Sequence, residues 1–263
     1  MNKNKAIGIF DSGVGGTSIW KEINKLLPLE NTIYLADSIN APYGNKSPEE
    51  ITELSIKNTE KLLEFDCKII VVACNTATTN AIKTLRGKYS IPIIGIEPAI
   101  KPAALATKSK SIGILATKGT LSSALFSQTN SEFTKDISVV EIIGEGLVPL
   151  IEKGDLDSPE MYALLKTHTQ PMIMANVDFI VLGCSHYPYI VNALKDILPE
   201  HIQIIDSGEA VAKQTKTVLQ NLDLIREDTE KPKLEFFTND TTQTLEFLLA
   251  RYADEINIYK AQF

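Results

Sequence analysis

Residues Ile69–Thr78 read IIVVACNTAT, and they indicate the fold more clearly than any other stretch of the chain. A continuous apolar run rich in β-branched residues is typical of a strand buried on both faces of a parallel sheet. The run ends in Cys74, Asn75 and Thr76. These residues would lie at the carboxyl edge of the sheet, where α/β folds place their ligand crevices. The stretch therefore predicts a thiol and two hydrogen-bonding side chains at a binding edge.

A second stretch repeats this pattern. Residues Phe179–Pro188 read FIVLGCSHYP, an apolar run that ends in Cys184 and is followed by Ser185 and His186. One chain therefore contains two similar strand ends, each followed by a cysteine. The repetition makes it less plausible that both thiols are merely buried and inert.

The bulk composition excludes several classes of protein. The 263 residues are 44% hydrophobic and 22% charged, which is ordinary for a globular protein. No run approaches the roughly 20 apolar residues of a membrane span, and no signal-peptide h-region precedes Asp11. The net charge of −7 disfavours nucleic acid as a partner. We expect a cytoplasmic protein with no membrane and no nucleic-acid partner, and free thiols rather than disulfides because the cysteines number three.

The first predicted strand leads into a glycine-rich turn. Ala6–Phe10 is apolar, and DSGVGGTS follows from Asp11, before a predicted helix that runs from Ile19 to about Leu27. Glycines allow close approach to a ligand, and a helix N-terminus offers unpaired N–H groups to an anion. A dinucleotide site is disfavoured, because the carboxylate of Asp11 would sit where a pyrophosphate binds.

The second predicted strand, Thr32–Ala36, also ends in a candidate binding loop. Pro42 and Gly44 indicate a turn that carries Tyr43 between them. A helix with Ser47 as its N-cap then runs to about residue 65. After Cys74 we predict a helix from about residue 78 to 89.

Alternating strands and helices predict an α/β fold with mainly parallel sheets. The echo of Asp11-Ser12-Gly13 in the DSG at 206–208 suggests two similar domains with a site in the cleft between them. We expect residues 1–97 with 208–263 to form the first domain and 98–207 the second; the alternative is one large sheet. Further strands are expected at 91–96, 111–116, 138–142, 178–182 and 202–205, with 233–238 as the last.

Several chemistries could use the cysteines. Cys67 is expected to pack as a small hydrophobe. A metal site lacks the usual ligand spacings, and a redox dithiol would usually be Cys-x-x-Cys. A Cys–His hydrolase could pair Cys184 with His186, although these nearby positions are expected to point apart, and Cys74 would have no role. A protein that binds an amino acid without catalysis is a further alternative.

The remaining alternative uses both thiols. One thiolate removes a proton from a carbon atom, and the other thiol returns a proton to the opposite face, which inverts a stereocentre without a cofactor or metal. The sulfurs would lie about 7 Å apart, on either side of the carbon. Asp11 could assist Cys74 and His186 could assist Cys184, while Glu152 could orient His186 or could simply be a solvated residue at a helix end.

Four motifs occur together: DSGVGG at 11–16, PYG at 42–44, CNTA at 74–77 and GCSHYP at 183–188. In order and spacing they resemble the glutamate racemases, a family of cofactor-independent amino-acid racemases, over essentially the whole chain. The resemblance implies an isomerase that interconverts L- and D-glutamate for peptidoglycan, and hence cell-wall, synthesis. It also implies a small-molecule substrate and a homodimer. Many family members have Thr where Ser185 stands, so a slightly looser pocket is expected here.

The resemblance also assigns roles to residues. The first cysteine would deprotonate D-glutamate and the second L-glutamate. The catalytic residues it implies are Cys74, Cys184, Asp11, His186 and Glu152. The substrate-binding residues it implies are Asp11, Ser12, Pro42, Tyr43, Gly44, Asn75, Thr76, Thr117, Thr120, Ser185 and His186.

Overall fold

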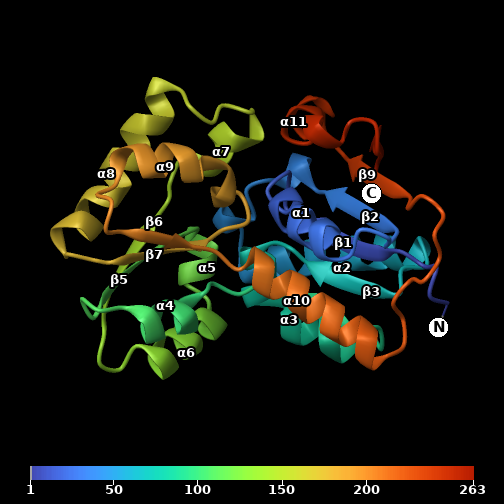
Figure 1. Cartoon of the computed structure of the whole chain (residues 1–263), viewed down its shortest axis with the longest axis horizontal. Coiled ribbons are helices and arrows are strands. Elements are labelled where there is room, and N and C mark those ends of the chain that lie inside the picture. Colours follow the sequence, from blue (N-terminus) through green and yellow to red (C-terminus); the bar gives the residue numbers. More distant parts are fainter. Residues whose placement is uncertain (1) are drawn as a thin grey trace.

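Two parallel sheets form the centres of two lobes that lie side by side (Figure 1). In this computed structural model, residues 2–263 are described, and within them the larger sheet has six strands in the order β10-β9-β2-β1-β3-β4. The strands are β1 (Ile7–Asp11), β2 (Thr32–Ala36), β3 (Ile69–Val72), β4 (Ile93–Gly95), β9 (Leu234–Thr238) and β10 (Ile256–Lys260).

The smaller sheet has four strands within the described residues, in the order β6-β5-β7-β8. The alternative of one large sheet is therefore wrong, and the predicted α/β class with two mainly parallel sheets is confirmed. The strands are β5 (Ser111–Ala116), β6 (Ser138–Ile143), β7 (Phe179–Gly183) and β8 (Gln203–Ile205).

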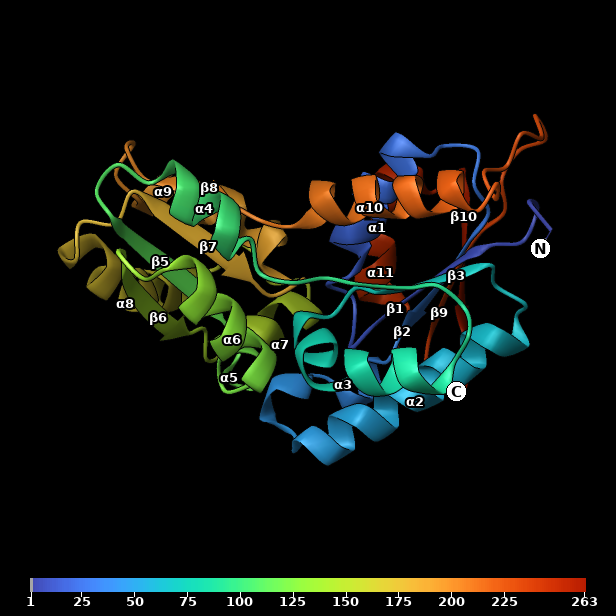
Figure 2. The same ribbon diagram turned by 90° about the horizontal axis from the view of Figure 1, so that it is seen from below.

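Helices cover both faces of each sheet, which explains the unbroken apolar runs of the central strands. In the first lobe, α1 and α10 lie on one face, and α2 and α3 lie on the other (Figure 2). Successive residues of β3 alternate between the two cores: Ile69 and Val71 pack with the first pair of helices, and Ile70 and Val72 with the second. The helices of this lobe are α1 (Thr17–Leu26), α2 (Pro48–Glu64), α3 (Asn75–Lys88), α10 (Gly208–Asn221) and α11 (Gln243–Leu248).

The second lobe is built in the same way. Helices α7, α8 and α9 bury one face of its sheet, and α4 and α6 bury the other. Within the described residues, no helix is long and apolar enough to cross a membrane. The helices are α4 (Ile100–Ala106), α5 (Lys118–Leu121), α6 (Ala124–Phe133), α7 (Leu147–Glu152), α8 (Pro159–Met174) and α9 (Val191–Ile197), and the short 3₁₀ helices of the chain are η1 (Ser38–Asn40), η2 (Tyr43–Asn45), η3 (Tyr187–Ile190) and η4 (Ala250–Tyr252).

The two sheets share an internal strand order. The run β2-β1-β3-β4 of the first sheet corresponds, strand for strand, to β6-β5-β7-β8 of the second. Cys74 follows β3 and Cys184 follows β7, so both thiols occupy the end of the third strand of their unit. The domain boundaries at residues 97/98 and 207/208 stay a prediction, although strands β1–β4, β9 and β10 fall on one side of them and β5–β8 on the other.

Two predicted elements were wrong. Residues 233–238 are not the last strand, because β10 follows at the edge of the sheet, beside β9. Helix α3 begins at Asn75 rather than at about residue 78, because the Cys74 sulfur accepts a hydrogen bond from the Ala77 amide and caps the first turn. The thiol is therefore part of the strand-to-helix junction itself.

A buried ion pair holds the C-terminal segment to the amino edge of the first sheet. Lys68 is fully buried and donates to Glu30 at 2.5 Å and to the carbonyl of Leu224 at 2.8 Å. Glu30 also accepts from the amide of Arg226 at 2.8 Å. Lys68 thus joins residues that are far apart in the sequence, at the end of β3 opposite to Cys74.

Replacing Lys68 by methionine should lower the free energy of unfolding by about 3–5 kcal/mol, because the Glu30 carboxylate would stay buried without its partner. Urea denaturation measures the change. Lys88→Met is the matched control, since Lys88 pairs with Glu60 at 2.8 Å on the surface and both side chains are about half exposed. The control should leave the unfolding midpoint nearly unchanged. Equal losses in the two variants would contradict the importance given to the buried pair.

Candidate active site

One small cavity between the lobes brings the two cysteines together. It contains most of the residues that the sequence singles out, and it adds Val148 from α7, which the sequence did not indicate. Asp11, Thr120 and Glu152 do not line the cavity, but each bonds to a residue that does. The lining residues are Ser12, Pro42, Tyr43, Gly44, Cys74, Asn75, Thr76, Thr117, Val148, Cys184, Ser185 and His186.

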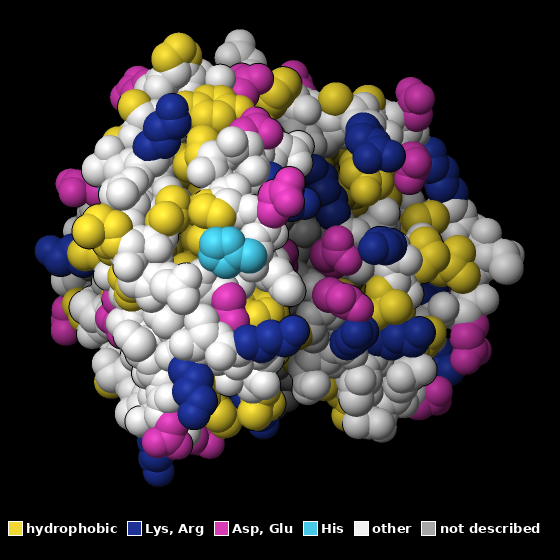
Figure 3. All heavy atoms as spheres, turned by 60° about the vertical axis from the view of Figure 1, so that its left-hand side comes forward, with side chains coloured by type: hydrophobic (Ala, Val, Ile, Leu, Met, Phe, Trp, Pro, Cys, Tyr) yellow, Lys and Arg dark blue, Asp and Glu magenta, His cyan; other side chains and the backbone are white. Residues whose placement is uncertain are grey.

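The lobes are closed around this cavity. Its volume is about 10 Å³, the space of roughly one water molecule. A neighbouring cavity of about 330 Å³ shares Pro42, Gly44, Thr117 and Val148 with it. On the face seen in Figure 3 the surface is hollowed between the lobes, and side chains of both charges lie along the groove. A ligand larger than water can therefore enter only if the wall of this cavity moves.

Cys74 is held as a neutral thiol. Its sulfur accepts from the Ala77 amide at 3.4 Å and lies 3.6 Å from the Ser12 hydroxyl. Burial raises the pKa of the Cys74 thiol strongly, and the nearby Asp11 carboxylate raises it further. At neutral pH Cys74 is therefore suited to donate a proton, and it needs a nearby positive charge before it can act as a base.

Asp11 connects the two lobes beside Cys74. One carboxylate oxygen accepts from the amides of Gly13 at 3.2 Å and Gly16 at 3.0 Å, and the other accepts from the Ser185 hydroxyl of the opposite lobe at 3.0 Å. Burial raises the pKa of Asp11, while the charge of His186 and the Gly16 amide oppose that rise. Asp11 is thus a buried carboxyl group that can exchange a proton within the site.

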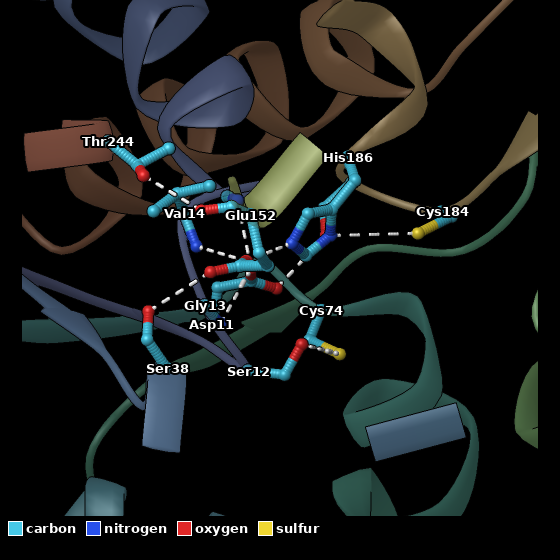
Figure 4. A network of polar contacts seen from close by, with 12 residues as sticks. Asp11, Ser12, Gly13, Val14, Ser38, Cys74, Glu152, Cys184, His186 and Thr244 are labelled. Carbon is cyan, nitrogen blue, oxygen red and sulfur yellow. Dashed lines mark hydrogen bonds and ion pairs between the residues drawn. The ribbon is translucent and has the colours of Figure 1, made fainter. Parts of the chain in front are cut away.

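Cys184 has a different proton partner, that is, a different neighbouring group that can exchange a proton with the thiol. Its sulfur lies 3.7 Å from Nδ1 of His186, and Nε2 of His186 forms an ion pair with Glu152 (Figure 4). Burial by itself lowers the pKa of His186, but the hydrogen bonds to Cys184 and Glu152 raise it well above its ordinary value. His186 is therefore suited to hold a proton between Cys184 and Glu152.

The expectation that residues 184 and 186 point apart was wrong. The chain turns from β7 towards η3 directly after Cys184, and His186 adopts helical backbone angles (φ −75°, ψ −32°). This turn folds the imidazole back towards the sulfur. Cys184 and His186 therefore come within hydrogen-bond distance, a contact that strand geometry would not give.

Hydroxyl and amide groups fill the rest of the cavity wall. The hydroxyl of Thr76 lies 2.8 Å from that of Thr117 and 3.3 Å from that of Thr120, which lie on the opposite lobe. Both side-chain polar atoms of Asn75 are buried without a hydrogen-bond partner. A buried polar group normally has a partner, so this amide is available to a ligand.

Tyr43 lines the cavity, and its hydroxyl is engaged within its own lobe. The hydroxyl donates to Asp37 at 2.5 Å and accepts from the Asn58 amide at 3.0 Å. A Cβ atom on Gly44 would lie 2.8 Å from Cβ of Thr117, so the loop can approach the second lobe only with glycine there.

Among residues 2–263, no group of three or more His, Cys, Asp and Glu side chains is arranged to hold a metal ion.

The fold and the paired-cysteine site define the class of protein. The model of the Asp/Glu/Hydantoin racemase family matches residues 7–215, so the chain belongs to that family and is an amino-acid racemase, an isomerase.

Its relatives are more specific. The chain is 46% identical over 207 residues to a glutamate racemase of Ralstonia pickettii. The aligned residues cover 79% of this chain and 73% of the relative. The structure of a glutamate racemase isoform of Bacillus anthracis superimposes with a TM-score of 0.87 at 31% identity, over 100% of this chain and 99% of that one. The Escherichia coli glutamate racemase, solved with L-glutamate, gives a TM-score of 0.85 at 31% identity, over 97% and 98%.

Asn75→Leu should stabilise the ligand-free protein by about 1 kcal/mol, because it removes two buried polar atoms that have no partner. The free energy of unfolding in urea measures this. Asn80→Leu is the matched control on the same helix, since its amide donates to the carbonyls of Thr76 at 2.8 Å and Gly119 at 3.1 Å. The control should destabilise the protein. A loss of stability in Asn75→Leu as large as in Asn80→Leu would show that the Asn75 amide is satisfied.

Proposed function

We propose that the protein interconverts L- and D-glutamate by moving the Cα proton between two cysteines without a cofactor. The observation that carries the proposal is the cavity lined by both thiols, each with its own proton partner and each from a different lobe. The substrate is taken from the relatives, which are glutamate racemases, one of them solved with L-glutamate.

The two thiols have complementary roles in this reaction. In the direction from L- to D-glutamate, Cys184 takes the Cα proton as a thiolate, and Cys74 delivers its own proton to the opposite face. His186 accepts or returns the proton of Cys184, and Glu152 stabilises the imidazolium that results. Because Cys74 rests as a thiol, the ligand-free site already holds the acid that this direction needs.

The reverse direction needs the thiolate of Cys74. The α-ammonium group of a bound amino acid supplies the positive charge that favours this thiolate, and Asp11 is placed to take part in the proton exchange. Cys184 then acts as the acid, with His186 as the proton source. In this proposal the enzyme's side chains and the substrate's own ammonium group are enough to run the reaction in either direction.

The cavity wall suits a dicarboxylic amino acid. The unpartnered amide of Asn75 and the hydroxyl of Thr76 can accept from the ammonium group, and they begin α3, where unpaired N–H groups favour a carboxylate. The remaining proposed substrate contacts include hydroxyls and loop backbone groups, which suit the two carboxylates. They are Asp11 and Ser12, Pro42 to Gly44, Thr117 and Thr120, and Ser185 and His186.

The cellular role follows the family resemblance. We propose a cytoplasmic enzyme that supplies D-glutamate for peptidoglycan synthesis and assembles as a homodimer. We also propose that residues 1–97 with 208–263, and residues 98–207, are the two domains that separate to admit the substrate. The domain boundaries rest on the repeated DSG motif and the two separate sheets, and the separation of the domains rests on the closed cavity.

Cys74→Ser and Cys184→Ser should each lower the rate of racemisation by about 10²–10⁴-fold, because each removes one acid–base group. Circular dichroism or chiral chromatography of incubated L-glutamate measures the rate. Cys67→Ala is the control: Cys67 lies in the core, away from the cavity, and burial raises the pKa of its thiol to about 12. The control should keep the wild-type rate.

The same variants separate the racemase from a Cys–His hydrolase. In a hydrolase only Cys184 would be essential, and a covalent adduct on it could be trapped. If Cys74→Ser racemised glutamate at the wild-type rate, the two-cysteine proposal would be wrong.

A further inference from the structure

Glu152 occupies an unfavourable place for a carboxylate. It is the last residue of α7, where the helix carbonyls present negative charge, and its side chain is only 16% exposed. A buried carboxylate at such a position needs hydrogen-bond donors from elsewhere. The hydrogen-bond donors around Glu152 therefore fix the position of its carboxylate.

Two of these donors come from the opposite lobe. The amide of Val14 donates to Oε1 at 2.8 Å, and the hydroxyl of Ser38 donates to Oε2 at 3.2 Å (Figure 4). His186 of the second lobe bonds to the same Oε1 as Val14. The carboxylate thus joins the proton partner of Cys184 to two groups of the first lobe.

These contacts depend on the closed arrangement of the two lobes. A Cβ atom on Gly13 would lie 2.0 Å from Oε1 of Glu152, so the glycine loop packs directly against the carboxylate. The Thr244 hydroxyl of the first lobe also donates to the backbone carbonyl of Glu152 at 2.7 Å. When the lobes open to admit a substrate, Glu152 loses Val14 and Ser38 together.

We propose that Ser38 is a positioning residue, which together with the Val14 amide fixes Glu152 against His186 only in the closed state, so that closure activates proton transfer at Cys184. The proposal deepens the proposed function and rests on it. Ser38 touches neither cysteine, so it acts through Glu152 and His186. Its loss should therefore affect one of the two proton transfers and spare the other.

The test uses Ser38→Ala in the full chain, with Ser38→Thr as the conservative variant. Loss of a hydrogen bond to a charged group should lower kcat/KM by about 10-fold, and Ser38→Thr should restore it. The value must fall equally for L- and D-glutamate, because the two enantiomers have equal free energy. Racemisation rates therefore cannot show which proton transfer is slowed, and isotope effects are needed.

The isotope effect on kcat/KM with Cα-deuterated glutamate distinguishes the two transfers. If transfer at Cys184 has become slower, the effect with L-glutamate should rise, and the effect with D-glutamate should fall. Ser18→Ala is the matched control, because Ser18 also donates across the lobes, to the carbonyl of Ser185 at 2.8 Å, without touching Glu152. It should leave the ratio of the two isotope effects unchanged.

An unchanged ratio in Ser38→Ala, or an unchanged kcat/KM, would overturn the proposal. A second readout does not depend on glutamate as the substrate. NMR measures the rate at which the Nε2 proton of His186 exchanges with solvent, and the bond to Glu152 slows this exchange. The chain has only three histidines, which makes the signal easy to assign. Faster exchange in Ser38→Ala but not in Ser18→Ala supports the positioning role, even if wild type fails to racemise glutamate. Equal exchange in Ser38→Ala and wild type contradicts it.

Discussion

The close packing of the glycine loop of the first lobe against the His186–Glu152 pair of the second is the constraint on which the site depends. Cβ atoms on Gly13 and Gly15 would lie 2.0 Å from Glu152 and 2.2 Å from His186, so only glycine permits this approach. The approach completes the proton partner of Cys184 with donors from the other lobe. It also reduces the cavity to the space of one water, which excludes solvent from the reacting groups and strengthens their electrostatic interactions.

The repeated strand order explains why two thiols meet, and their surroundings explain why they differ. Each cysteine ends the third strand of a 2-1-3-4 unit, and the carboxyl edges of the two sheets face one cavity. Cys74 is buried beside the Asp11 carboxylate, which raises the pKa of its thiol, whereas Cys184 lies beside His186, whose pKa is raised. Two equivalent strand ends thus carry thiols in different surroundings, which suits the two-base reaction that we propose.

Local patterns in the sequence predicted the strands and the position of both cysteines, because buried parallel strands are marked by unbroken apolar runs. They missed β10, since Ile256–Lys260 forms an edge strand that is largely exposed and carries no such run. They placed the start of α3 late, because Asn75, Thr76 and Thr78 are poor helix formers and the cap is a cysteine. The contact of Ser38 with Glu152 joins residues 114 apart, so no local pattern could indicate it.

The central claim is that two different groups handle the Cα proton. The most direct measurement is the deuterium content of glutamate at early times, when the enzyme racemises L-glutamate in D₂O. If one cysteine removes the proton and the other delivers a solvent-exchanged deuteron, the D-glutamate formed should carry deuterium at Cα and the remaining L-glutamate should carry almost none. Deuterium appearing in L-glutamate as fast as in D-glutamate would mean that one group serves both faces, and would contradict the account.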